Sequence, residues 1–554
     1  MADTPHGLIL YDHPNSPCAR RVRITLVEKD LAWATQIIDL SRLEQRRPEY
    51  LALNPNGVVP TLAHGTRVIY ESNVITAYLD DQFPAVALYP IDPDDLAAVH
   101  AWQAAELAMA KDYRPLMYQR LLGPLLRLTR TLDEALAAAR RSTSDAADLA
   151  WEEKVWNLAV LTPPAEAAAE ARLWAWLDRL EGHLDGRTFL VGERCTQAEV
   201  SVYPRVMMYA FVQLPITAAR HPRVAAWMAR LRERPSFATT LSDADRQLLA
   251  LAQRPLLPWL GRTLQKNRPS LLDRLKLGIA RRMARRALGE ARIGRDQTAE
   301  KTRALLKPRT GDVAPADMPA RRGDPATAAE RAAALILYDH PLSPHGRRVR
   351  IVLREKGLAW TTLEVDLLRM AHKAPDYLAV NPAGELPALR HGERIVVDTP
   401  AIAAYLERVF PAVPLAPDQA WPLAQMRMWL ALEAGTHKEF RPLWWLCVAR
   451  PALADALAPG VAETHAQWWR DVAAGQPRFD TSPELARRIV TQKLAVLEGR
   501  LARHEYLVGE ALSMADIAWF TRVELLPQLG VEVTHPGIRR WSARLAARPA
   551  FAAA

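Results

Sequence analysis

The sequence predicts two copies of a module in which a small mixed α/β domain is followed by an all-helical domain. The chain contains LILYDHPNSPCARRVRI, from Leu8, and repeats this stretch as LILYDHPLSPHGRRVRI, from Leu335. The offset of 327 residues, which pairs Ser16 with Ser343, holds without a gap as far as Lys111. A repeat of that length is a domain and not a solenoid unit. The 554 residues also exceed what one core holds, since single domains usually run about 100–200 residues.

The first part of each copy has the pattern of a small sheet covered by helices. LILYDH is a short apolar run typical of a buried strand, and RRVRITLVEKD predicts a helix that begins near Arg20, with Val22, Ile24 and Leu26 facing inward. A second strand is predicted near residues 33–39, followed by two strands around a turn at 64–65 and a helix over NVITAYLDDQF. This order of elements fits a mixed sheet with helices packed on it.

The second part of each copy is predicted to be helical throughout. From about Asp92 onward no strand signal remains, and runs such as LAAVHAWQAAELAMAKDY and AEARLWAWLDRLEGHL have the pattern of amphipathic helices. TQAEVSVYP and SMADIAWF match the capping box, in which two side chains satisfy the free amides of a helix start. We therefore expect Thr196 with Glu199, and Ser513 with Asp516, to be structural.

A basic connector separates the two copies. Between residues 241 and 334 the chain has 20 Lys+Arg and 10 Asp+Glu, which equals the net charge of +10 of the whole sequence. Residues 270–293 predict a basic amphipathic helix, which either packs on its own modules or contacts an anionic membrane surface. Residues 307–329 are typical of a flexible linker. No nucleic-acid motif accompanies the charge, so we expect no nucleic-acid partner. The predicted domains are 1–88, 91–240, 241–333, 334–414 and 415–554.

The scarce cysteines limit the chemistry. Cys18, Cys195 and Cys447 are too isolated for a disulfide framework or a metal site, so a reducing compartment and no bound metal are expected. No apolar run approaches the roughly 18 residues of a membrane span. The first residues lack the pattern of a secretory signal. We expect a cytoplasmic protein.

Four motifs in fixed order identify a family resemblance. The order S-P-x-x-R-R-V-R, N-P-x-G-x-V-P, E-S and a late [ST]-x-x-[DE] occurs in the first copy, and the second copy follows it with close substitutions. It resembles the cytosolic glutathione transferases, above all the serine-type theta and zeta classes and bacterial relatives that include lignin β-etherases and dehalogenating enzymes. The resemblance covers nearly all of both copies. It implies a thioredoxin-like domain followed by a helical domain in each, and glutathione as co-substrate.

The resemblance also implies which residues hold glutathione. Pro60 and Pro387 would follow a cis peptide bond, and the backbone of Val59 and Leu386 would pair with the cysteinyl part. An acidic residue and a hydroxyl residue would receive the γ-glutamyl end, where a helix N-terminus favours the carboxylate; Ser72 is also expected to cap the following helix. The glycine carboxylate would meet a cation or amide. These last two sets are Glu71, Ser72, Asp398 and Thr399, and then Gln45, Arg46, His372 and Lys373.

Ser16 and Ser343 are the residues expected to act in the chemistry. A hydroxyl that donates to sulfur stabilises the glutathione thiolate, and a nearby helix N-terminus adds to the effect. Cys18 lies two residues after Ser16, where zeta members also carry a cysteine, which leaves thiol–disulfide chemistry open. The second copy has His345 at this position.

Three functional classes therefore remain open. The first is attack of the glutathione thiolate on a small hydrophobic electrophile, by conjugation, β-ether cleavage, dehalogenation or isomerisation. The second is a thiol–disulfide oxidoreductase that uses Cys18, and the third is a non-catalytic binding or scaffold protein with one or both modules degenerate. The aromatic residues that either wall the electrophile pocket or belong to the core are Tyr113, Tyr118, Trp444 and Trp445. The family is usually dimeric, so the two modules are expected to form a pseudo-dimer within one chain.

Overall fold

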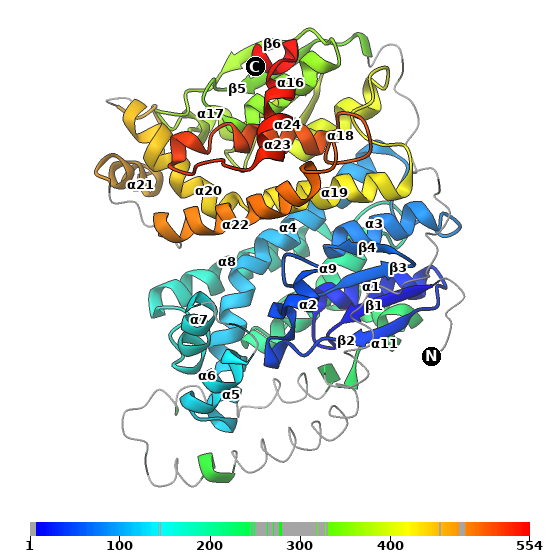
Figure 1. The fold of residues 1–554 in the computed structure, drawn as a ribbon. Coiled ribbons are helices and arrows are strands. Elements are labelled where there is room, and N and C mark those ends of the chain that lie inside the picture. Colours follow the sequence, from blue (N-terminus) through cyan, green and yellow to red (C-terminus); the bar gives the residue numbers. More distant parts are fainter. Residues whose placement is uncertain are drawn as a thin grey trace. The chain divides into compact units, whose positions relative to one another are not determined.

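The computed structural model divides the chain into two compact units, 1–316 and 317–554 (Figure 1). It describes residues 7–141, 146–243, 331–453, 456–475 and 482–554, and the isolated positions 143, 245–246, 249, 263, 270, 276–279, 318 and 327. Most of the predicted linker and most of the predicted basic helix over 270–293 lie outside these residues. Each unit contains one α/β domain, called here the head, and one helical domain, called the body.

The two heads share one topology. In unit 1 the strands have the order β2-β1-β3-β4, with β1 parallel to β2 and the other pairs antiparallel. Unit 2 repeats this as β6-β5-β7-β8. The elements of head 1 are β1 Leu8–Asp12, α1 Pro17–Glu28, β2 Ala34–Ile37, η1 Leu40–Arg42, η2 Glu44–Arg46, α2 Pro48–Leu51, β3 Thr61–His64, β4 Arg67–Tyr70 and α3 Ser72–Gln82. Those of head 2 are β5 Leu335–Asp339, α16 Pro344–Glu355, β6 Thr361–Glu364, η5 Ala371–Lys373, α17 Pro375–Leu378, β7 Ala388–His391, β8 Arg394–Val397 and α18 Thr399–Val409.

The two bodies consist of helices joined by turns and loops, and their described residues contain no strand, as the sequence predicts. Body 1 comprises α4 Pro93–Met117, η3 Tyr118–Leu122, α5 Gly123–Thr129, α6 Leu132–Arg140, α7 Ala146–Trp156, α8 Pro163–His183, α9 Gln197–Met207, η4 Met208–Val212, α10 Pro222–Glu233 and α11 Pro235–Thr239. Body 2 comprises α19 Ala420–Ala434, α20 His437–Trp444, η6 Trp445–Ala449, η7 Arg450–Ala452, α21 Glu463–Ala473, α22 Pro483–Leu501, α23 Met514–Val523, η8 Pro527–Leu529, α24 Pro536–Ala546 and α25 Pro549–Ala552. No helix among the described residues is both long and apolar enough to cross a bilayer.

Helix α1 joins head 1 to body 1. Its inward residues Val22, Ile24 and Leu26 are completely buried, as the helical pattern predicts. Ile24 belongs to the same apolar cluster as Tyr203 and Trp227 of the body. The head and body of this unit therefore share one core, and α1 carries the predicted site at its N-terminus.

Each body contains one π-helical turn at an equivalent place, Tyr118–Leu122 and Trp445–Ala449. Pro124 follows the first turn and Pro451 follows the second. A proline nitrogen cannot donate to the carbonyl four residues earlier, so the turn widens. The amides of Gly123 and Arg450 accordingly donate five residues back, to the carbonyls of Tyr118 and Trp445.

Both predicted capping boxes are present. The Thr196 hydroxyl accepts from the Ala198 amide at 3.2 Å, and Glu199 accepts from the Thr196 amide at 2.9 Å. Ser513 and Asp516 form the second box. Glu199 also accepts from the backbone amide of Leu190, which fixes the loop before the helix.

Replacing Thr196 by alanine is expected to lower the free energy of unfolding of unit 1 by about 1–2 kcal/mol, because a buried helix start loses its cap. Chemical denaturation followed by circular dichroism measures this. Thr196→Ser, which keeps the hydroxyl, should lose less than half as much. Equal losses for the two variants would contradict a capping role.

Candidate active site

Ser16 and Ser343 cap the helices on which the site is built. Helix α1 begins at Pro17, so the predicted start near Arg20 is wrong by one turn and Ser16 is the N-cap residue. The Ser16 Oγ accepts from the Ala19 amide at 3.2 Å, and the Ser343 Oγ accepts from the Gly346 amide at 3.0 Å. Because each oxygen acts as an acceptor toward its helix, each hydroxyl hydrogen remains available to donate to a ligand.

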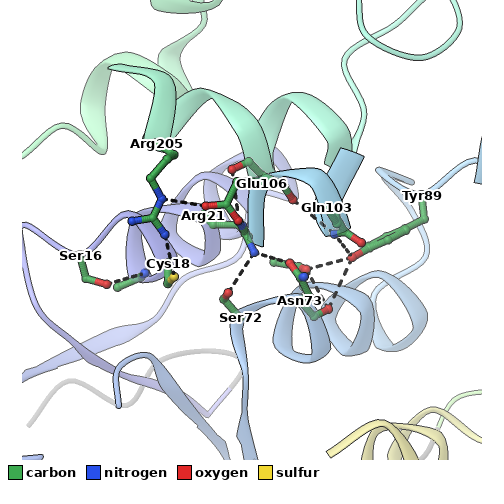
Figure 2. A network of polar contacts seen from close by, with 12 residues as sticks. Ser16, Cys18, Arg21, Ser72, Asn73, Tyr89, Gln103, Glu106 and Arg205 are labelled. Atoms are coloured by element: carbon green, nitrogen blue, oxygen red, sulfur yellow. Dashed lines mark hydrogen bonds and ion pairs between the residues drawn. The ribbon is translucent and has the colours of Figure 1, made fainter. Parts of the chain in front are cut away.

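A buried polar network connects the two parts of the unit 1 site (Figure 2). Arg21 donates to the Ser72 Oγ at 3.1 Å and to Glu106 at 2.6 Å, and Arg205 donates to the other oxygen of Glu106 at 2.8 Å. The two arginines hold the pKa of Glu106 below its ordinary value although burial opposes this. The network therefore ties Ser72 of the head to helices α4 and α9 of the body through a fixed negative charge.

Cys18 lies at the end of this network. It is the second residue of α1, it is half-buried, and its Sγ accepts from Arg205 Nη2 at 3.8 Å. The guanidinium group of Arg205 and the N-terminus of α1 both place positive potential at the Cys18 sulfur. Unit 1 thus places a hydroxyl and a thiol within one turn of the same helix.

Unit 2 repeats the ionic core but changes the residue at the cysteine position. Arg348 and Arg522 both bind Glu433, whose pKa is lowered to about 2 by the two guanidinium groups against the effect of burial. His345 replaces the thiol, and its ring lies 5.6 Å from that of His437. Burial lowers the pKa of His345 well below its ordinary value, so the imidazole is neutral at pH 7. The described contacts of Arg348 do not include Thr399, the counterpart of Ser72.

The expected cis bonds are present, and the acidic positions have a backbone conformation that side chains rarely adopt. The bonds Val59–Pro60 and Leu386–Pro387 are cis. Glu71 has φ 68° and Asp398 has φ 74°. A non-glycine residue at positive φ costs on the order of 1–3 kcal/mol and is concentrated at functional sites. That both units keep this conformation at the predicted γ-glutamyl position supports a shared binding role.

The acidic residues differ in their neighbours. Asn56 donates to Glu71 at 2.8 Å in unit 1. Burial, and then the nearby carboxylate of Glu385, raise the pKa of Asp398 in unit 2. The expected helix cap at Ser72 is corrected, because Ser72 is the first residue of α3 and Glu71 occupies the N-cap position. The Ser72 hydroxyl is instead held by Arg21.

The residues predicted to meet the glycine carboxylate lie on the short helices η2 and η5. Arg46 is 3.6 Å from Asp148 of α7, and Lys373 donates to the Ala383 carbonyl at 3.0 Å. Gln45 Oε1 and His372 Nδ1 are buried and have no partner among the described residues. A ligand with suitable polar groups would satisfy these two atoms.

The four predicted pocket residues separate into core and wall. Tyr113 is completely buried and its hydroxyl donates to the Met208 carbonyl at 3.0 Å, which corresponds to the core alternative. Trp444 is also buried, and its Nε1 has no described partner. Tyr118 and Trp445 sit on the π-turns and contact Trp151 and Trp468. The pocket-lining role stays a prediction for Tyr118, Trp444 and Trp445.

The Arg–Glu–Arg clusters are the functional feature that sequence patterns did not single out. Glu106 and Glu433 are offset by the repeat distance of 327, whereas Arg205 and Arg522 are offset by 317. The signal available in the sequence was a glutamate at the same repeat offset in both copies, within a stretch predicted to be helical.

Comparison with known proteins finds domains of one family in both units. Sequence models described as glutathione S-transferase, N-terminal domain, match residues 15–82 and 337–414, and one described as glutathione S-transferase, C-terminal domain, matches 159–235 and 445–549. Glutathione S-transferase 3 of Zea mays is 35% identical over 40% of this chain and 92% of its own length. A probable maleylacetoacetate isomerase of Vibrio cholerae is 29% identical over 42% of this chain and 94% of its own length. The crystal structure of the β-etherase LigF from Sphingobium is 26% identical, with a TM-score of 0.35, over 40% of this chain and 98% of that one.

Proposed function

Because this chain belongs to the glutathione S-transferase family, we propose that it is a glutathione-dependent transferase in which Ser16 and Ser343 stabilise the glutathione thiolate. The observation that carries the proposal is the geometry of these serines. Each Oγ accepts from its own helix, at 3.2 Å in unit 1 and 3.0 Å in unit 2, and so leaves its hydrogen available to donate to a bound sulfur. The helix N-terminus adds a favourable potential for the negative sulfur.

The proposed reaction needs no group beyond glutathione and the electrophile. The thiol loses its proton to solvent, and the sulfur lone pair forms a bond to an electrophilic carbon. In a substitution, the leaving group departs with the bonding electrons; in an isomerisation, the sulfur leaves again after rotation about the activated bond. The serine donates a hydrogen bond throughout and is neither a base nor a nucleophile. Conjugation, β-ether cleavage, dehalogenation and isomerisation share this first step.

The glutathione contacts proposed for unit 1 follow the described geometry. The Glu71 carboxylate receives the γ-glutamyl ammonium, while Ser72, oriented by Arg21, and the start of α3 receive the neighbouring carboxylate. Asp398, Thr399 and α18 take these roles in unit 2. Calorimetric titration of the full chain with glutathione tests the proposal. Micromolar to millimolar binding to two sites supports it, and no binding would leave the scaffold alternative.

One specific contact favours the second candidate function, a thiol–disulfide oxidoreductase. Arg205 donates to the Cys18 Sγ, which stabilises the thiolate needed for attack on a disulfide. In that step the Cys18 sulfur bonds to one sulfur of the disulfide, and the other sulfur leaves as a thiolate.

Cys18→Ser separates the two functions. In a chain that also carries Ser343→Gly, so that only unit 1 can act, we expect Cys18→Ser to conjugate glutathione at least about tenfold faster than Ser16→Gly, because the thiolate donor of unit 1 is intact. Reduction of a small disulfide by glutathione should disappear only if Cys18 carries that activity. The conjugation assay and the disulfide assay are run on the same preparation. Equal loss of conjugation in the Cys18 and Ser16 variants would contradict the assignment of Ser16.

The proposed pseudo-dimer also has a direct measurement. If the two modules complete each other, the solution mass should correspond to one chain of 61.9 kDa. A mass of two chains at working concentration would count against this arrangement.

A further inference from the structure

The seam between the head and body of unit 2 is built from the loop after β6 and from helix α21. Trp469 Nε1 donates to the Leu368 carbonyl at 3.0 Å, and the Ala458 amide donates to the Arg369 carbonyl at 2.7 Å. These contacts hold α21 against the segment that leads to His372 and Lys373. Side chains on the inner face of α21 therefore meet the residues of η5.

A row of tryptophans lines this seam and ends at a cation. The ring of Trp445 lies 5.0 Å from Trp444 and 4.8 Å from Trp468. The Arg441 guanidinium carbon lies 5.9 Å from the centre of the Trp468 ring. Arg441 is exposed and Trp468 is half-buried. No carboxylate of the described residues forms an ion pair with Arg441, so a planar cation stands open beside an aromatic face.

Basic side chains from three elements converge on the same seam. His372 is only 6% exposed, and both its Nδ1 and that of His465 are buried without a described partner. Burial, and then the nearby Lys373, His465 and Arg441, lower the pKa of His372 to about 3. The one described carboxylate that acts on Lys373 is Glu385. The glycine carboxylate of glutathione is expected at His372 and Lys373, and His465 and Arg441 are further basic side chains close enough to act on His372.

Unit 1 has the opposite charge at the equivalent place. Trp151 contacts Tyr118 at 5.2 Å just as Trp468 contacts Trp445, so the two tryptophans correspond. Three residues before Trp151 stands Asp148, which pairs with Arg46 at 3.6 Å. Three residues before Trp468 stands His465. In unit 1 the Asp148 carboxylate thus neutralises Arg46. In unit 2 the corresponding cation is Lys373, and the basic side chain of His465 stands in place of the carboxylate.

Arg441 lies on the helix whose first residue meets the N-terminal turn of α16. His345 is two residues after Ser343, and its ring is 5.6 Å from that of His437 at the start of α20. Arg441 is one turn further along α20, and residues four apart on a helix lie about 6 Å apart on the same face. Arg441 therefore stands one helical turn beyond the side chain that meets His345.

We propose that unit 2 accepts an aromatic electrophile that carries a carboxylate, which Arg441 binds while Trp468 stacks on the ring. The inference rests on the proposed function, because Ser343 must hold the glutathione sulfur. The carboxylate takes no part in bond formation: the sulfur bonds to the ring or benzylic carbon, and the leaving group departs with its electrons. Arg441 and His465 are specificity-determining residues, and His465 acts by leaving Lys373 without the counter-ion that Asp148 supplies to Arg46 in unit 1.

The test compares two product analogues that differ in one group, S-(4-carboxybenzyl)glutathione and S-benzylglutathione, titrated calorimetrically into the full chain. We expect the carboxylated conjugate to bind one site about 5–10-fold more tightly, which corresponds to about 1–1.4 kcal/mol. Arg441→Gln and His465→Asp should each reduce this ratio to near one. Arg114→Gln, the equivalent exposed position of unit 1, is the matched control and should preserve it.

Each outcome decides something different. Equal binding of both conjugates to the unmodified chain would overturn the inference and leave the proposed function intact. Binding of neither conjugate would overturn both. Loss of the ratio in Arg114→Gln, with retention in Arg441→Gln, would place an anion site in unit 1 and contradict the assignment to unit 2.

Discussion

Replacing Glu106 by glutamine is expected to destabilise unit 1 by about 3–5 kcal/mol, since it leaves the buried Arg21 and Arg205 without their counter-ion. Glu106 is completely buried and lies 2.6 Å and 2.8 Å from the two guanidinium groups. Glutamine keeps the shape but removes the charge that compensates two desolvated cations. Calorimetric unfolding of the full chain measures the shift of the unit 1 transition.

A second ion pair on the same helix provides the control. Asp112 pairs with Arg172 at 2.7 Å, and the Arg172 side chain is 59% exposed. Solvent screens such a pair, so Asp112→Asn should cost less than about 1 kcal/mol. Equal losses of unfolding free energy in the Glu106 and Asp112 variants would show that the buried Arg–Glu–Arg cluster stabilises unit 1 no more than an exposed ion pair does.

The pH dependence of the same cluster has a definite sign. The folded pKa of Glu433 is about 2, below its ordinary value of 4.5, and that of Glu106 is also lowered. A group with a depressed folded pKa stabilises the fold fully above its unfolded pKa, and this contribution is lost as the pH falls toward the folded pKa. Part of the acid lability of the unmodified chain between about pH 4.5 and pH 2 should therefore be absent in Glu106→Gln and Glu433→Gln.

Local patterns predicted most of the heads, because their strands, turns and helices are encoded by nearby residues. The same patterns misplaced the start of α1 by one turn: Pro17 is a favourable first helical residue, and Ser16 before it is a favourable cap. The cap of α3 was misassigned since Glu71 adopts a positive φ that no local pattern predicts. Boundaries of this kind depend on a few capping interactions, not on hydrophobic periodicity.

Contacts between distant segments could not be predicted in this way. Glu106 is 85 residues from Arg21 and 99 from Arg205, and only the packing of α1, α4 and α9 brings them together. The correspondence of Asp148 with His465 could not be predicted either, because the offset between the two copies is no longer 327 residues at these positions. It becomes visible only through the stacking of Trp151 and Trp468 on the two π-turns.

The two units therefore share the same fold and the same central residues of the site, but they differ in the side chains next to those residues. Both retain the serine cap, the cis proline, the positive-φ acid and the Arg–Glu–Arg cluster. They differ in the groups that a ligand would meet next, with Cys18 against His345 and Asp148 against His465. If the serines stabilise the glutathione thiolate as proposed, this pattern is what we expect of two units that use the same thiolate on different electrophiles.

Removing both serine hydroxyls should have the largest effect on activity. We expect Ser16→Gly together with Ser343→Gly to lower kcat/KM for conjugation by roughly 25-fold at pH 7, because a thiol pKa that returns upward by about two units, to about 8.5, forfeits about 2.7 kcal/mol of thiolate stabilisation and leaves only a few per cent of the bound thiol ionised. Glycine is chosen because it keeps most of the N-cap stability, whereas alanine loses about 1 kcal/mol. Each single variant should lower the turnover of its own unit by the same factor and leave that of the other unit unchanged.

The pH profile distinguishes a thiolate donor from a merely structural serine. In the unmodified chain the rate should level off above the lowered thiol pKa, whereas in the double variant it should keep rising to about pH 8.5, the ordinary thiol pKa. Ser16→Thr together with Ser343→Thr keeps both hydroxyls and should retain a profile close to the original one. The ultraviolet absorbance of the bound thiolate gives the same pKa without turnover. A double glycine variant with reduced rate but an unshifted thiolate pKa would mean that the helix N-terminus, and not the hydroxyl, holds the charge on sulfur.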